Sequence, residues 1–90
     1  LGADGVISVV SNLYPREISN LVNYGLSEDF ERAKDLHYEL LQLTRAMFVE
    51  TNPIPIKYAM FLKGLIKEAY RSPMCEMRKE NKDLVRRALL

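Results

Sequence analysis

The stretch Gly5-Val6-Ile7-Ser8-Val9-Val10 decides the fold that the sequence predicts. It is short, rich in β-branched residues and apolar at nearly every position, so it lacks the alternation of a strand with one wet face. Such a run is typical of a strand buried on both faces, as in a parallel sheet. The rest of the chain is patterned as helix. The sequence therefore predicts a predominantly α chain, with one buried β-strand at residues 5–10 followed by about four helices.

The first two helices are bounded by capping and turn residues. Asn12 is the expected N-cap of the first helix, and Pro15 lies near its first turn. Gly25 and Ser27 are expected to end it. Ser27 or Asp29 then caps a second helix. The apolar stripe of this second helix follows helical spacing over Phe30, Ala33, Leu36, Leu40, Leu43, Met47 and Phe48.

A double-proline corner at Pro53 and Pro55 breaks the second helix, and Pro55 is expected to open the third at its first position. Gly64 is expected to lie near the end of the third helix. The apolar residues of this helix are Ile56, Ala59, Met60, Leu62, Leu65 and Ile66. A linker around Ser72 and Pro73 precedes a short last helix. This last helix carries Leu84, Val85, Ala88 and Leu89.

Composition limits the classes of function. The 90 residues carry 13 basic and 12 acidic side chains, a formal net charge of +1, which argues against nucleic acid or an anionic membrane as partner. The single cysteine, Cys75, has no disulfide partner, so we expect a reducing, cytoplasmic setting. No signal peptide is apparent, and no apolar run reaches the roughly 18–20 residues of a membrane span.

The predicted strand is the difficulty in this pattern. A strand that is apolar on both faces needs a pairing strand on each edge, and each buried unpaired N–H or C=O costs about 1–3 kcal/mol. The sequence offers no second strand. The chain also starts at Leu1, without an initiator methionine. We therefore expect it to be part of a longer protein.

Few residues are candidates for chemistry. His37 has Leu40 and Leu41 where a metal partner would lie, so we expect no metal site. Ser8 and Ser11 follow the predicted strand without a nucleophile-elbow motif, so a hydrogen-bonding role is favoured over nucleophilic catalysis. Cys75 has no neighbouring histidine and is expected to be inert.

The lysines are predicted to lie on solvated helices or loops, where nothing would lower an ammonium pKa enough for Schiff-base chemistry. Lys57, just after the double-proline corner, is the one exception, and we expect a structural pairing for it. The basic residues near the end of the chain are interleaved with Glu76, Glu80 and Asp83, which favours a solvated face. These basic residues are Arg78, Lys79, Lys82, Arg86 and Arg87.

Several segments resemble the dihydrodipicolinate synthase family, a group of pyruvate-dependent lyases. The first is Gly2-Ala3-Asp4-Gly5-Val6-Ile7-Ser8-Val9, similar to the last barrel strand of that family. The likeness continues through Asp29-Phe30-Glu31-Arg32-Ala33 and then through Phe48-Val49-Glu50-Thr51-Asn52-Pro53-Ile54-Pro55-Ile56-Lys57. The Asn-Pro-Ile-Pro-Ile-Lys run is the most specific of these motifs. Arg71-Ser72-Pro73-Met74 resembles a turn near the family's end.

The resemblance implies a fold and a function. Residues 1–27 would be the last strand and helix of a TIM (β/α)₈ barrel, and residues 28–90 the C-terminal helical subdomain. The parent would be a cytoplasmic, homo-oligomeric lyase that condenses pyruvate with aspartate semialdehyde through a lysine Schiff base, in lysine and diaminopimelate biosynthesis. The catalytic lysine, tyrosines and arginine of the family lie on earlier barrel parts, so this chain has no catalytic residue and would be inactive alone. Ile7 matches a substrate-binding position, where the main chain borders pyruvate. No cofactor and no metal are implied.

A different class of function remains open from the residues alone. Helices that cover a barrel expose apolar faces when the barrel is absent. The chain would then be a standalone helical module that associates with itself or with another protein, without catalysis.

Overall fold

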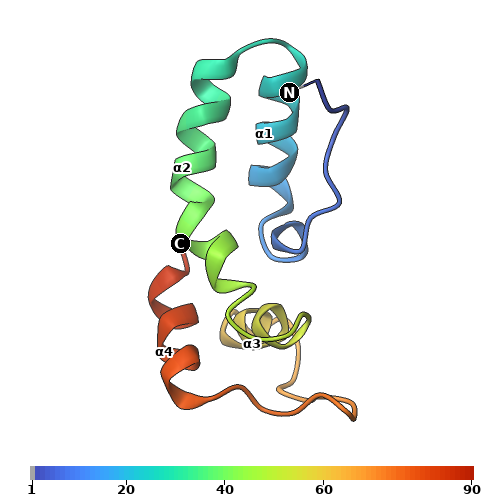
Figure 1. The fold of residues 1–90 in the computed structure, drawn as a ribbon, viewed down its shortest axis with the longest axis vertical. Coiled ribbons are helices and arrows are strands. Elements are labelled where there is room, and N and C mark those ends of the chain that lie inside the picture. Colours follow the sequence, from blue (N-terminus) through green and yellow to red (C-terminus); the bar gives the residue numbers. More distant parts are fainter. Residues whose placement is uncertain (1) are drawn as a thin grey trace.

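The computed structural model describes residues 2–90, and every regular element in that range is helical. The elements are a 3₁₀ turn η1 (Val10–Asn12) and the helices α1 (Pro15–Leu26), α2 (Phe30–Ala46), α3 (Ile54–Leu62) and α4 (Lys79–Ala88). The antiparallel α1–α2 hairpin forms one end of a molecule of 41 × 23 × 22 Å, and α3 and α4 form the other (Figure 1). Between residues 2 and 90, no helix combines the length and the apolar character needed to cross a bilayer.

The predicted buried strand at residues 5–10 is wrong for this chain. Residues 2–8 have no regular structure, and Val6 and Ile7 are exposed, at 58% and 105%. Within the described range, no backbone-to-backbone hydrogen bond involves residues 5–8. The physical reason is the missing pairing strand: backbone groups that have no neighbouring strand keep their hydrogen bonds to water by staying at the surface. Only the end of the stretch, at Val10, turns into η1 and is buried.

The helix boundaries agree with the sequence in part. Asn12 is not the N-cap of α1; it lies in η1, and its side-chain amide donates to the Val9 carbonyl at 3.0 Å. Tyr14 holds the N-cap position, and Pro15 and Ser27 bound the helix as expected. Asp29 caps α2, where its carboxylate accepts a hydrogen bond from the Arg32 N–H at 3.3 Å.

The third helix is shorter than predicted. α3 begins at Ile54, so Pro55 takes its second position, and it ends at Leu62. Gly64 follows with φ of 74°, in the left-handed region that glycine adopts at helix ends. Leu65 and Ile66, predicted to be helical, therefore lie in the connector to α4, and Leu65 is 59% exposed.

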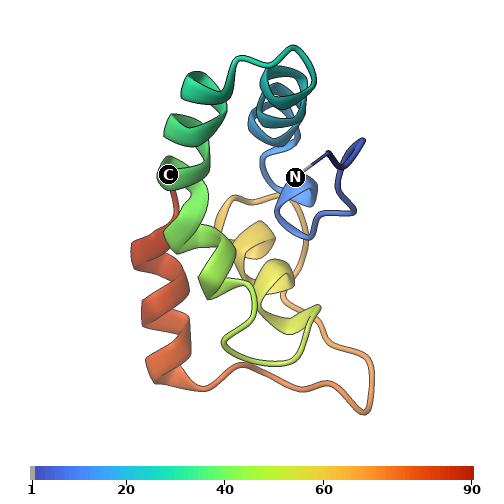
Figure 2. The same ribbon diagram turned by 45° about the horizontal axis from the view of Figure 1, so that its top comes forward.

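The hydrophobic core lies where the end of α2 meets α3 and α4 (Figure 2). Ala46 and Met47 at the end of α2 are fully buried, and so is Val85 of α4. The turn after the N-terminal segment adds Val10 and Leu13 to the same cluster. The remaining buried members are Leu43, Ile54, Ile56, Tyr58, Ala59 and Met77. One core therefore ties both ends of the chain to α2.

Helix α1 and the first half of α2 contribute little to that core. No residue of α1 is buried, and the predicted stripe of α2 is buried only from Leu40 onward. Phe30 and Phe48, at the two ends of the stripe, are 64% and 61% exposed. The hairpin thus has an apolar face that the described part of the chain leaves uncovered.

Adjacent side chains at the end of α2 give a matched pair of stability variants. Met47→Ala removes a fully buried side chain and should lower the free energy of unfolding by about 2–5 kcal/mol. Phe48→Ala, next to it and 61% exposed, should change it by no more than about 0.5 kcal/mol. Urea unfolding followed by circular dichroism measures both free energies of unfolding. Equal losses in the two variants would show that Met47 is not a core residue.

Candidate functional site

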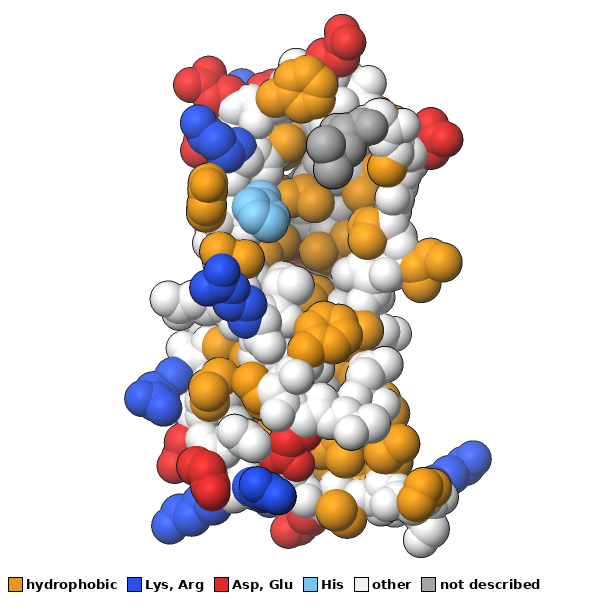
Figure 3. Space-filling view, viewed as in Figure 1, with side chains coloured by type: hydrophobic (Ala, Val, Ile, Leu, Met, Phe, Trp, Pro, Cys, Tyr) orange, Lys and Arg blue, Asp and Glu red, His pale blue; other side chains and the backbone are white. Residues whose placement is uncertain are grey.

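The hollow beside Ile7 is the candidate site, since it contains the one residue that the sequence linked to a substrate. Its volume is about 320 Å³, and it lies between the N-terminal segment, α1 and α2. Hydrophobic side chains gather between the two helices on this face (Figure 3). The lining residues are Val6, Ile7, Ser8, Val9, Val10, Ile18, Leu21, His37, Thr44 and Phe48.

The hydroxyl groups near the hollow make local hydrogen bonds. The Ser11 hydroxyl donates to the Ser8 carbonyl at 2.7 Å, and the Ser11 N–H donates to the Ser8 hydroxyl oxygen at 3.2 Å. Thr44 donates to the Leu40 carbonyl one turn back in α2, at 2.9 Å. The two Ser8–Ser11 contacts lie where the N-terminal segment ends and η1 starts, as serine side chains commonly do at turns. Ser8 and Ser11 therefore form a turn and have no acid–base partner in it.

His37 lies at the exposed surface of α2, with its ring edge-on to Tyr38 at 5.4 Å between centroids. Across residues 2–90, no group of three or more His, Cys, Asp or Glu side chains could hold a metal ion. The hollow can receive apolar groups and offers main-chain atoms around Ile7. Its polar lining residues are Ser8, His37 and Thr44.

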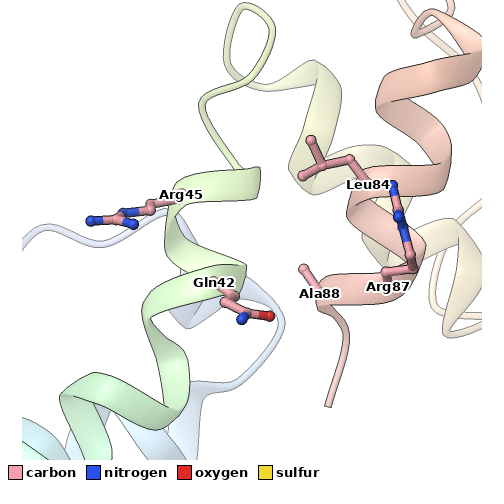
Figure 4. Close-up of a pocket in the computed structure, with 5 residues that line it drawn as sticks. All are labelled: Gln42, Arg45, Leu84, Arg87 and Ala88. Carbon is pink, nitrogen blue, oxygen red and sulfur yellow. The ribbon is translucent and has the colours of Figure 1, made fainter.

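A second hollow, of about 370 Å³, lies between α2 and α4. In Figure 4, Gln42 of α2 points toward Ala88, and Leu84 points back toward α2. The Arg45 side chain extends away from α4, so it does not converge with Arg87 on one ligand position (Figure 4). This groove has no anion-binding geometry.

The densest polar contacts are elsewhere, around Lys82 of α4. Its ammonium donates to the Glu68 carboxylate at 2.9 Å, lies 3.6 Å from a Glu76 oxygen, and sits 5.1 Å from the centre of the Tyr58 ring. The hydrogen bond to Glu68 raises the pKa of Lys82. Arg86 donates to the Tyr58 hydroxyl at 2.8 Å.

Tyr70 lies against the same cluster. Its hydroxyl oxygen is enclosed and lacks a well-aligned hydrogen bond within the described residues. Burial raises the pKa of Tyr70 to about 12, and the negative charge of Glu68 adds to the rise. The Lys57 ammonium lies 5.4 Å from the centre of the Tyr70 ring, a structural pairing of the kind expected for this lysine.

The prediction of a solvated basic face was incomplete. Arg78, Lys79, Arg86 and Arg87 are exposed, but Lys82 has a side chain only 21% exposed. The helical spacing contained the signal, because Lys82 lies three residues before the fully buried Val85 and so on the same face of α4. Its partner Glu68 lies 14 residues earlier in a segment without periodicity, where spacing gives no guide.

Solved dihydrodipicolinate synthases share this fold. The crystal structure of the enzyme from Aquifex aeolicus matches with a TM-score of 0.92 and 44% identity, over 96% of this chain and 29% of that chain. The enzyme from Thermotoga maritima matches with a TM-score of 0.92 and 40% identity, over 97% of this chain and 30% of that chain. Both likenesses define the class: the helical end of a dihydrodipicolinate synthase.

Related sequences indicate the same class of protein as the solved structures. The 4-hydroxy-tetrahydrodipicolinate synthases of a Hydrogenobaculum species and of Methanocaldococcus jannaschii are each 48% identical over 89 residues, 99% of this chain and 31% of the relative. The model of the dihydrodipicolinate synthetase family matches residues 1–90. The chain therefore belongs to the dihydrodipicolinate synthetase family, and it spans about a third of the length of these relatives.

Tyr70 gives a prediction for alkaline pH. Its pKa in the fold, about 12, lies above the ordinary value of 10.0, so its contribution to stability is complete below pH 10.0 and is lost as the pH rises toward 12. In a spectrophotometric titration of the five tyrosines, one phenol should ionise late. Tyr70→Phe should remove that late step, and Tyr38→Phe, at an exposed position, should keep it. A late step that survives in Tyr70→Phe contradicts the assignment.

Proposed function

We propose that this chain is the C-terminal part of a cytoplasmic lyase that condenses pyruvate with aspartate semialdehyde through a lysine Schiff base, in lysine and diaminopimelate biosynthesis. The remainder of the barrel supplies the catalytic lysine. Residues 1–27 complete the barrel with its last strand and helix, and residues 28–90 form the helical subdomain outside it. The assembled protein is a homo-oligomer.

The observation that carries the proposal is the match to relatives that share one activity name over 99% of this chain. The matched part is 31% of those relatives, so most of their length has no counterpart here. A solved relative from Acinetobacter baumannii, 34% identical with a TM-score of 0.92, is described in complex with pyruvate. Pyruvate is therefore the substrate that we assign to the assembled protein.

The state of the N-terminal segment supports the barrel proposal. Residues 5–7 carry backbone groups without a backbone partner, and the apolar side chains of Val6 and Ile7 lie at the surface, an arrangement that neighbouring strands would satisfy. In the barrel, the Ile7 main chain would border pyruvate and its side chain would form an apolar wall. The exposed face of the α1–α2 hairpin would pack on the rest of the barrel.

Complementation tests this proposal. The chain alone should show no pyruvate-dependent condensation, and borohydride should trap no pyruvate on its lysines. Mixed or co-expressed with the missing N-terminal two-thirds of the Methanocaldococcus jannaschii enzyme, it should restore turnover. Trapping on any lysine of the isolated chain, or a failure to restore activity when the two parts co-purify, contradicts it.

The same assay separates the main chain of Ile7 from its side chain. In the complemented enzyme, Ile7→Val keeps the apolar wall and should change kcat/KM less than about threefold. Ile7→Asp places a charge at that wall and should lower kcat/KM by about a hundredfold or more. Equal effects of the two variants on kcat/KM would show that the Ile7 side chain does not line the substrate site.

A helical module that associates with itself, without catalysis, is the alternative function. The specific observation in its favour is the uncovered apolar surface. Phe30 and Tyr38 are each 64% exposed, and Phe48 is 61% exposed. Such surfaces in small proteins mark contact sites.

Sedimentation at several concentrations tests the alternative. Self-association through the hollow predicts a dimer or larger species that Phe48→Ser weakens by about tenfold in Kd. Leu65→Ser, at a position 59% exposed in the connector, is the matched control and should leave the Kd unchanged. A monomer at all concentrations that binds no apolar dye contradicts this function.

A further inference from the structure

The connector between α3 and α4, residues 63–78, has an unusual construction (orange in Figures 1 and 2). It has no helix or strand, and between residues 66 and 77 the structure records one backbone-to-backbone hydrogen bond, from the Met74 N–H to the Arg71 carbonyl at 2.8 Å. Met77 is its one buried residue. We call residues 63–78 the strap.

The two ends of the strap are fixed to other elements. At its start, the Lys63 ammonium donates to the Leu90 carbonyl at 3.1 Å. At its end, the Arg78 N–H donates to the Glu50 carboxylate at 2.9 Å, and the Asn81 side chain donates to the same oxygen at 2.9 Å. Because these contacts lie at or beyond residues 63 and 78, they do not hold the middle of the strap.

One ammonium group makes the ion pairs that hold the middle of the strap, beside Tyr70 and Met74, which pack against the core. Lys82 contacts Glu68 in the first half of the strap at 2.9 Å and Glu76 in the second half at 3.6 Å. The same ammonium lies over the Tyr58 ring of α3. A single side chain of α4 therefore joins both halves of the strap to α3.

The burial of the Lys82–Glu68 pair makes the contact sensitive to loss of either charge. Their side chains are 21% and 18% exposed, whereas that of Glu76 is 69% exposed and more fully hydrated. Removing one partner of a partly buried pair leaves the other without compensation in a poorly hydrated position. Moving the strap into water relieves that cost, because few backbone bonds oppose the movement.

We propose that the strap is a conformational device: a segment that opens as a unit from α3 and α4 when the charge of Lys82 or of Glu68 is lost, while the helices keep their fold. Opening releases Tyr70 and bares the α3 side chains beneath the strap. The helices remain because ten of the eleven buried core residues lie outside the strap. The exception, Met77, adjoins the end of the strap that is fixed through Arg78 and stays with it.

Cys75 allows a direct test. It is the only cysteine, it is exposed, and it lies in the strap, so a nitroxide label there reports the mobility of the strap by electron paramagnetic resonance. In the full 90-residue chain, Lys82→Gln and Glu68→Gln should each raise the mobile fraction of the label about tenfold, with unchanged helicity by circular dichroism. Lys79→Gln, an exposed neighbour on α4, is the matched control and should have no effect.

The reversed pair, Lys82→Glu with Glu68→Lys, should return the label toward its mobility in the unsubstituted chain. Unchanged label mobility in both single variants overturns the proposal. If a single variant lowers helicity, urea titration of the unsubstituted chain decides, since a segment with few backbone hydrogen bonds opens before the core unfolds. Label mobility must then rise before helicity falls, and a simultaneous change shows that the strap is no separate unit.

Discussion

The structure depends on the burial of one end of α2. Ala46 and Met47 have no exposed surface, and the elements on either side of them in the sequence converge on that point. From one side come Val10 and Leu13 of the N-terminal turn, and from the other come α3 and α4. The opposite end of α2 has no comparable support, because α1 buries none of its residues. A chain of this size has little apolar surface to bury, and here it is concentrated at one end. The hairpin is consequently the part whose apolar face the described residues leave uncovered.

The N-terminal segment is governed by backbone hydrogen bonding. Its residue types favour a strand, but a strand requires edges supplied by other strands. Because residues 2–90 contain no strand, the segment keeps its peptide groups at the surface and folds back along α1. Membership in the dihydrodipicolinate synthetase family gives this a simple physical account, since the chain aligns with about a third of each relative and the neighbouring strands would come from the rest. The apolar residues at 5–10 suit a buried environment that this chain does not contain.

The sequence located helices well and polar contacts poorly. The stripe of α2, the Asp29 cap and the Pro53–Pro55 corner followed from local rules of spacing, capping and proline geometry. The Asn12 cap failed because Asn12 lies in a 3₁₀ turn stabilised by its own local bond. The Lys82 cluster was missed because its partners come from an aperiodic segment, and only the path of residues 63–78 over α4 brings Glu68 and Glu76 to one ammonium. Ile7 was linked to a substrate by family resemblance alone, and the hollow beside it is lined mainly by apolar side chains.

By itself, the sequence determined the family, the helical composition after residue 10 and the positions of the main turns. The family followed from the resemblance of whole segments. The helices and turns are fixed by residues close together in the chain, through capping, periodicity and the restricted backbone of proline. The tertiary structure alone decided that residues 5–8 stay unpaired, that α3 ends at Leu62, and that Lys82 joins α3, the strap and α4. These outcomes depend on which distant groups are within reach, such as a pairing strand or a carboxylate 14 residues away. Local residue patterns do not show whether such a distant strand or carboxylate is within reach.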